Sequence, residues 1–258
     1  SRIDADSSGS ITPWEVVGNL PESRDQATVA ATGDDIYIIG NHPGTSAVTR
    51  VRIESDGTIG ARFVESSLNQ PRYNGAAFVH ENWLWQIGGA NQSVDGAVLA
   101  STEHAAINAD GSLDPWIEGP ELNAARTGFA LVKTDSHVYV ISGVDRNFPR
   151  NDVERAKLLP GGGIGPWELL SVVVPARNLP SAALTEGCIF YGGGSTLTSV
   201  TRDDVYCLRL TPEGDIAAVT LQSAMTVIRQ EPDMFTAGEF VYITGGAGGS
   251  GAGLNGWQ

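Results

Sequence analysis

Residues 72–89 read RYNGAAFVHENWLWQIGG, and this stretch decides the fold because its pattern recurs along the chain. An arginine opens it, an aromatic residue follows thirteen positions later, and a glycine or other small pair closes it at sixteen to seventeen positions. A turn glycine stands fifteen residues before each arginine. The copies begin at Arg24, Arg72, Arg126, Arg177 and Arg229. Five ungapped copies of one register indicate an internal repeat.

Each copy has the pattern of four short antiparallel strands, because apolar runs of four to six residues alternate with two-residue turns. We expect the innermost strand after the arginine, as in 76–79 and 129–132, and a second strand that ends at the glycine pair. A variable loop then leads to a third strand, such as 48–53 or 205–210, followed by the turn glycine and an outer strand. One such sheet cannot bury both faces alone, so the repeat predicts a radial stack of sheets, a β-propeller.

The predicted fold is all-β, with one propeller domain of five four-stranded antiparallel blades over residues 1–258. The repeats lie at about 18–65, 66–118, 119–170 and 171–221, and the fifth joins 222–258 with 1–17. In that closure, residues 1–5 supply the third strand of the last blade and residues 11–17 its outer strand. A segment cut from a longer propeller at equivalent points would have the same ends.

Glycine pairs that follow an apolar and aromatic strand, as in 85–89 and 242–246, make the whole chain resemble the Kelch-repeat family. A Trp near the end of three of the units, at Trp14, Trp116 and Trp167, adds to the resemblance, whereas Arg62 and Val219 replace it in the other two. Kelch propellers more often have more than five blades. Because copper-dependent galactose oxidases and sialic-acid epimerases are among the Kelch-type relatives, the resemblance implies that a sugar-acting oxidase or epimerase is one possible function.

Composition limits the possible partners. The 258 residues are 41% hydrophobic, enough for a substantial core, and carry a net charge of −14. Nucleic acid requires a basic surface that displaces counterions, and an anionic membrane surface attracts basic segments. We therefore expect no nucleic-acid partner and no direct membrane insertion.

The two cysteines bear on the compartment. Cys188 opens the second strand of the fourth repeat and Cys207 lies in its third strand, so adjacent antiparallel strands can place the two side chains opposite each other. We predict a disulfide between them, as the alternative to free cysteines that pack as small hydrophobic residues. A disulfide suits an exported protein, and we expect an extracellular, cell-surface or periplasmic location.

The N-terminal segment contains a weak calcium candidate. Its spacing of oxygen-bearing residues around Gly9 matches an EF-hand loop, with the ligands Asp4, Asp6, Ser8 and Glu15. The repeat explains Gly9 equally well, and Pro13 opposes the helix that would follow such a loop. We expect no cofactor, with calcium as the remaining candidate.

The arginines and the loops after the glycine pairs are expected on the same side of the sheets, which we call the loop face. One interpretation of the arginines is a ring that binds an anion, and the other is a structural role through carboxylates or backbone carbonyls. The loops and the residues beside the arginines vary between copies, and loops on a rigid scaffold commonly carry recognition. The binding candidates are the five arginines with His42, Tyr73, Asn74, Asn91, Asp95, Arg146 and Phe148.

No catalytic residue is predicted. Among the expected inner strands only Asp233 is acidic, with Asp25 and Glu231 nearby, whereas glycosidases require paired carboxylates. Of the four histidines, only His42 is expected on the loop face, so a copper site of clustered ligands is not expected. The predicted function is a nonenzymatic module that binds a protein or a glycan through the loop face. The alternatives are a sugar-acting Kelch-type enzyme and a structural component of a larger surface assembly.

Overall fold

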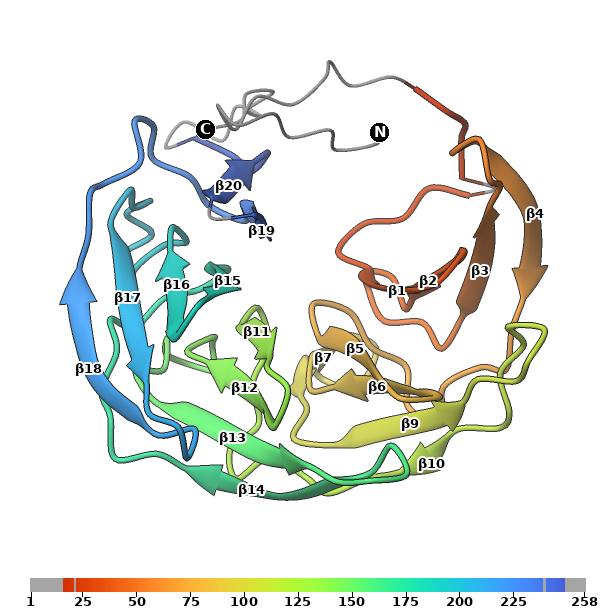
Figure 1. The fold of residues 1–258 in the computed structure, drawn as a ribbon, viewed down its shortest axis with the longest axis horizontal. Helices are drawn as coiled ribbons and strands as arrows, with labels where there is room; N and C mark the ends of the chain where they lie inside the picture. Colours follow the sequence, from red (N-terminus) through yellow and green to blue (C-terminus); the bar gives the residue numbers. More distant parts are fainter. Residues whose placement is uncertain (1–15, 21, 239, 249–258) are drawn as a thin grey trace. The chain divides into compact units, whose positions relative to one another are not determined.

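The computed structural model describes residues 16–20, 22–238 and 240–248, and its regular elements in these ranges are β-strands (Figure 1). No helical segment in the described ranges has the length and apolar character needed to span a bilayer. The calcium candidates Asp4, Asp6, Ser8 and Glu15 lie outside the described residues.

Four of the repeats form four-stranded antiparallel sheets. In the first sheet the strand order is β1 (Thr28–Thr32), β2 (Asp35–Ile39), β3 (Val48–Ile53) and β4 (Ile59–Val64). The second has the order β10 (Ile117–Glu118), β9 (Thr102–Ala106), β6 (Trp83–Ile87) and β5 (Ala76–His80), and its loop carries a hairpin of β7 (Ala90–Asn91) and β8 (Ala97–Val98).

The third sheet contains, in order, β11 (Ala130–Lys133), β12 (His137–Ile141), β13 (Val153–Leu158) and β14 (Ile164–Leu169). The fourth contains β15 (Ser181–Thr185), β16 (Cys188–Gly192), β17 (Val205–Leu210) and β18 (Ile216–Leu221). In the fifth repeat, β19 (Asp233–Ala237) pairs with β20 (Phe240–Thr244). Residues 1–15 of the predicted closing strands are outside the described part of the chain, so closure stays a prediction. Val16 and Val17, predicted at the end of the outer strand, are exposed and not in a strand.

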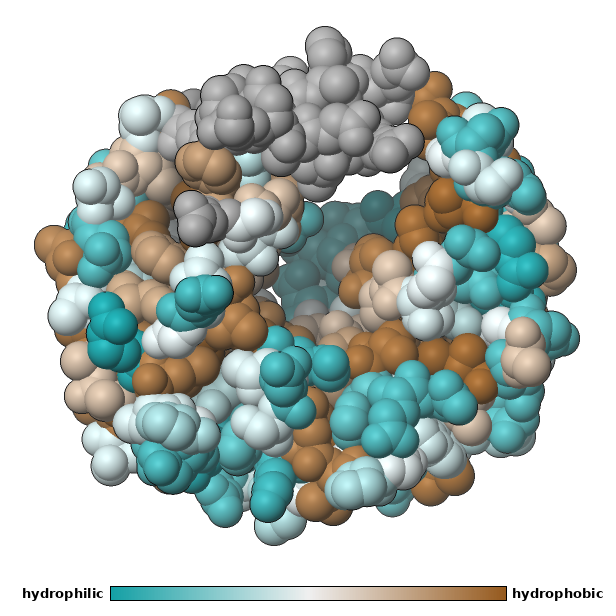
Figure 2. Space-filling model, in the orientation of Figure 1, coloured by the Kyte–Doolittle hydropathy of each residue, from teal (hydrophilic) through white to brown (hydrophobic). Residues whose placement is uncertain are grey.

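The chain divides into two compact units. The first unit comprises Ser1–Glu121 and Pro160–Gly163, and the second comprises Leu122–Leu159 and Ile164–Gln258. In the first, Tyr37, Leu84 and Trp116 belong to one buried core. In the second, one core contains Ile189 and Leu208, and another forms around Met225 and Met234. Figure 2 shows hydrophilic and hydrophobic residues interspersed over the face in view.

The aromatic residue that recurs thirteen positions after the arginine joins neighbouring repeats. In three repeats the polar tip of the aromatic side chain donates a hydrogen bond to the carbonyl oxygen of the turn glycine in the following repeat. These bonds join Tyr37 Oη to Gly111 (2.6 Å), Trp85 Nε1 to Gly162 (2.9 Å) and Tyr139 Oη to Gly214 (2.7 Å). The aromatic residue thereby buries its ring while its polar group stays hydrogen-bonded. Each such bond links one repeat to the next.

The turn glycines are required for two reasons. Gly162 has a φ of +84°, a conformation that side chains rarely adopt, and a Cβ atom there would collide with the ring of Trp83. Its neighbour Gly161 has a φ of +83°, but a Cβ atom there would meet nothing within 4 Å. The two adjacent glycines therefore separate the conformational requirement from the packing requirement.

We predict that Gly162→Ala destabilises the protein more than Gly161→Ala does. Both variants force alanine into the left-handed region, which costs about 1 kcal/mol, but only Gly162→Ala adds an overpacking cost of about 1–3 kcal/mol against Trp83. Urea unfolding of both variants measures the difference. Equal losses in the free energy of unfolding would show that the close approach to Trp83 has no energetic role.

Candidate functional site

The arginine side chains bond within their own repeats. In four copies, Nη1 donates to the carbonyl oxygen sixteen residues later, at the first position of the glycine or small pair. These bonds run from Arg24 to Gly40 (3.1 Å), Arg72 to Gly88 (2.9 Å), Arg126 to Ser142 (3.0 Å) and Arg229 to Gly245 (2.6 Å). The constant spacing read from the sequence is therefore the span of one hydrogen bond across the first two strands.

Acidic side chains complete the arginine contacts. Arg72 Nη2 lies 2.5 Å from Glu103 Oε1, and Arg126 pairs in the same way with Glu154. In the fourth repeat Arg177 pairs with Asp204 at 2.6 Å. Burial alone would raise the pKa of Asp204, but its hydrogen bond to Arg177 and the charge of that guanidinium bring the pKa below its ordinary value of 3.8.

The two buried glutamates also bind the chain just before the arginine. Glu103 accepts backbone N–H bonds from Asn69 (2.7 Å) and Gln70 (3.1 Å). Glu154 accepts the equivalent bonds from Asn123 (2.7 Å) and Ala124 (3.2 Å). The sequence signal, which we did not use, is Leu-Asn-x-x-Arg in these two repeats, with a glutamate at the second position of the third strand.

The burial and the partners of the arginines fit a structural role rather than a ring that binds an anion. Arg72, Arg126 and Arg229 are only 1%, 0% and 2% exposed. Arg72 and Arg126 donate to carbonyls and carboxylates of the same repeat, and Arg229 donates to the carbonyl of Gly245. A buried arginine requires such partners. The guanidinium groups of Arg72 and Arg126 therefore form the frame beneath the loop face.

Four of the other predicted site residues gather in the first unit. The antiparallel strand order places the loop after the glycine pair and the segment after the arginine at the same end of each sheet. His42 and Tyr73 pack nearly perpendicular, with ring centroids 4.9 Å apart. His42 Nδ1 lies 3.9 Å from a carboxylate oxygen of Asp25. Beside them, Asn74 follows Tyr73, and the buried Asn91 lies against the loop at Gly44.

A repeated backbone feature at this position escaped the sequence reasoning. The second residue after every arginine has a positive φ, and in four repeats this residue is not glycine. The residues are Gln26 (55°), Asn74 (50°), Gly128 (56°), Leu179 (55°) and Glu231 (57°). Left-handed backbone is strained for residues with a side chain, and such strain clusters at functional sites. Gly128 and Asn74 are residue types that favour this conformation, whereas Gln26, Leu179 and Glu231 give no signal in the sequence.

These left-handed residues are linked from one repeat to the next. The N–H of Asn74 donates to the carbonyl of Gln26 (2.9 Å) in the first unit. In the second unit Leu179 donates to Gly128 (2.8 Å) and Glu231 donates to Leu179 (3.1 Å). The strained turns on the loop face of each unit are therefore held in a fixed relation.

The remaining predicted residues lie elsewhere. Asp95 is exposed, with a φ of +50°, in the turn of the β7–β8 hairpin. Arg146 and Phe148 are exposed on a loop of the second unit, where Asp145 accepts the N–H of Phe148 at 2.8 Å. The structure thus brings together only part of the predicted set, because the loops differ in length and belong to two units.

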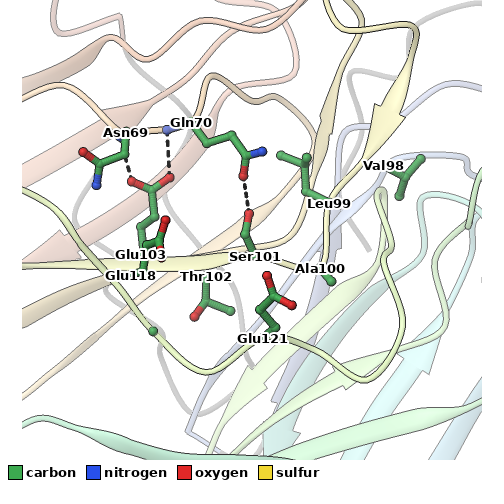
Figure 3. A pocket seen from close by; sticks show the side chains of 11 residues that line it. Asn69, Gln70, Val98, Leu99, Ala100, Ser101, Thr102, Glu103, Glu118 and Glu121 are labelled. Atoms are coloured by element: carbon green, nitrogen blue, oxygen red, sulfur yellow. Dashed lines mark hydrogen bonds between the residues drawn. The ribbon is translucent and has the colours of Figure 1, made fainter.

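A pocket at the loop face of the second sheet was not predicted (Figure 3). Its volume is about 460 Å³, and its side chains include the exposed carboxylates of Glu118 and Glu121. Ser101 donates to Gln70 at 2.5 Å on its wall, and the buried Glu103 lies beside them. Oxygen-rich walls of this kind accept hydrogen bonds. The residues come from three separate segments, so no single sequence motif predicts the pocket.

The histidines are spread over the first three sheets. His42 lies on the loop face, whereas His104 and His137 lie in β9 and β12. His80 is the last residue of β5 and pairs with Trp83. In the described ranges, no three His, Cys, Asp or Glu side chains form a group that could hold a metal ion.

Cys188 and Cys207 are joined by a disulfide, with Cα atoms 5.7 Å apart. They are not directly opposite in the ladder, since Cys188 pairs with Arg209 and Cys207 pairs with Phe190. The bridge is therefore diagonal across β16 and β17. The expected extracellular, cell-surface or periplasmic location stays a prediction.

Comparison with known proteins supports the fold. No family model matches the chain. Beta-scruin from Limulus polyphemus is 21% identical over 205 residues, which cover 75% of this chain and 22% of that protein. The chain thus spans about a fifth of the length of this curated relative. The solved structure of YjhT matches with a TM-score of 0.54 and 11% identity, covering 92% of this chain and 94% of the other. These likenesses and the four-stranded antiparallel sheets are consistent with a Kelch-like propeller.

We predict that Arg126→Met lowers the free energy of unfolding by about 3–5 kcal/mol, because Glu154 would remain buried without its cation. Adding Glu154→Leu should restore only part of the loss, since the N–H groups of Asn123 and Ala124 would then lack their acceptor. Urea unfolding measures both variants. Arg146→Met, which changes an exposed arginine of the same unit, is the control and should shift stability by less than about 0.5 kcal/mol. An equally small effect of Arg126→Met would contradict the structural role.

Proposed function

We propose that this chain is a five-bladed Kelch-like propeller that acts as a nonenzymatic binding module, with a protein or a glycan as its partner. The observation that carries the proposal is the cluster on the loop face of the first unit. There His42 packs on Tyr73 and faces Asp25, and all three residues differ from their counterparts in the other repeats. Aromatic and polar side chains on rigidly supported loops are typical of recognition surfaces.

The repeated residues are buried and the variable residues are exposed, and this difference supports the proposed function. The repeated arginines and the glutamates that pair with them are buried, so their charges are balanced inside the fold. The exposed groups of the loop face come from positions that change from copy to copy. A ligand therefore meets the variable residues, while the repeated ones hold the loops in place.

The blade number rests on the register of the repeat. In the other four copies the position that corresponds to Ile3 is occupied by Val51, Ala105, Ala156 and Leu208, which are all buried. The next position, that of Asp4, is occupied by Arg52, Ala106, Lys157 and Arg209, none of which is fully buried. We propose that residues within 1–15 supply the third and outer strands of the fifth repeat.

A binding screen tests the proposed function. We expect purified protein to bind a component of an oligosaccharide array or of a panel of purified extracellular proteins, and Tyr73→Ala and His42→Ala each to weaken that binding at least about tenfold. Asp34→Ala, an exposed change in the β1–β2 turn at the other end of the first sheet, is the matched control and should leave affinity unchanged. A ligand whose affinity is insensitive to Tyr73 and His42 would place the binding site elsewhere.

The closure of the fifth repeat has its own test. Ile3→Asp should lower the free energy of unfolding by about 3 kcal/mol or more, because it would bury an unpaired carboxylate in a sheet. Asp4→Ser, one position away, should have little effect. If urea unfolding shows no difference between the two variants, residues 1–15 do not form part of the predicted sheet.

A further inference from the structure

We infer that the loop face of the first unit binds a neutral carbohydrate, at a site formed by Asp25, Gln26, His42, Tyr73 and Asn74. This inference rests on the proposed function and names the class of ligand. The five residues are contiguous: His42 contacts Asp25 and Tyr73, and Asn74 donates its N–H to the carbonyl of Gln26 at 2.9 Å.

The charges at this site favour an uncharged ligand. Arg24 is directed into the fold, where it donates to Gly40 O (3.1 Å) and to Thr49 Oγ1 (2.8 Å), and its side chain is 6% exposed. Arg72 is buried against Glu103. The carboxylate of Asp25, in contrast, is 74% exposed. An anionic group would therefore approach a carboxylate while both nearby guanidinium groups are occupied, which opposes binding.

The chemistry of the side chains suits hydroxyl groups. The amides of Gln26 and Asn74 offer both donors and acceptors, and the Asp25 carboxylate accepts hydrogen bonds. Tyr73 and His42 contribute ring surface, on which the C–H groups of a sugar ring can pack. A few placed polar groups combined with an aromatic surface can orient a polyhydroxylated ring.

The left-handed turn that carries these amide side chains is a shared feature of the repeats, since Leu179 and Glu231 adopt it too. Gly128 adopts the same turn in the third repeat, so the turn itself requires no side chain. Gln26 and Asn74 adopt the left-handed conformation at φ values of 55° and 50°, where a Cβ atom is unfavourable. A glycine therefore fits this half-buried turn, and replacing Gln26 or Asn74 with glycine removes the side chain without disturbing the backbone conformation.

A buried acceptor beneath the same turn lacks a partner. Gln86 is 0% exposed, and its Nε2 donates to Thr28 Oγ1 at 3.4 Å, but its Oε1 has no hydrogen-bond donor. The amide lies against Gly75, the residue after Asn74, where a Cβ atom would collide with it. An unsatisfied buried acceptor is costly. A donor carried by a bound ligand, or a water that it orders, would satisfy Gln86.

Glycine substitution separates binding from folding at this site. Gln26→Gly and Asn74→Gly remove the amide side chains and relieve the left-handed strain, so we expect the melting temperature to stay unchanged or rise. Affinity for a neutral oligosaccharide, found on an array and measured by calorimetry, should fall at least about tenfold in each variant. Leu179→Gly, at the equivalent turn of the second unit, removes some apolar packing and should leave affinity unchanged.

The outcomes distinguish this inference from the proposed function. A neutral oligosaccharide whose binding is lost in Gln26→Gly and Asn74→Gly, and kept in Leu179→Gly, supports the inference. Binding to anionic oligosaccharides alone, or a neutral hit that tolerates both glycine variants, overturns it. If no oligosaccharide binds but a purified protein does, and Tyr73→Ala abolishes that contact, the inference fails and the proposed function stands. If Tyr73→Ala and His42→Ala change no binding at all, both fail.

Discussion

In four of the five repeats, the bond from the arginine guanidinium to a carbonyl oxygen sixteen residues later is the interaction on which the first two strands depend, whereas Arg177 donates instead to Ala176 and Asp204. It ties the start of the first strand to the end of the second, as between Arg72 and Gly88. A buried guanidinium is tolerated only when its charge and its donors are satisfied, which explains the paired Glu103 and Glu154. Those carboxylates in turn hold the backbone of the segment that arrives from the preceding repeat. One charged side chain thus organises three segments of chain.

The glycine pairs follow from the same constraint. At Gly89 a Cβ atom would lie 2.6 Å from the carbonyl oxygen of Tyr73, and at Gly194 the equivalent distance to Asn178 is also 2.6 Å. The pair also donates across to the next repeat, since the N–H of Gly194 bonds to the carbonyl of Arg229 at 2.8 Å. Backbone segments approach closely here, and no side chain fits between them. The rigid loop bases that result can support recognition by the variable residues above them.

Much of the strand pattern could be predicted from the sequence because it depends on local signals. The strands at 48–53 and 205–210 have the predicted bounds, since turn glycines and apolar runs mark their ends. The sequence also placed both His42 and Tyr73 on the loop face, because His42 follows a small-residue pair and Tyr73 follows a repeated arginine. The left-handed conformation of Gln26 and Leu179 was not, because neither residue type announces a positive φ. The pocket around Ser101 and Glu121 was equally hidden, since its walls come from separate segments.

The sequence by itself determined the repeat, its four-stranded antiparallel sheet and the positions of the loops. Periodic spacing indicates which backbone atoms must lie close together within each repeat. Only the tertiary structure decided what the arginines do, because burial and ion-pair partners depend on segments about thirty residues apart, as with Arg72 and Glu103. It also decided which variable residues become neighbours. His42 and Tyr73 meet because adjacent repeats in the first unit bring their loops together, whereas Arg146 and Phe148 lie on the second unit.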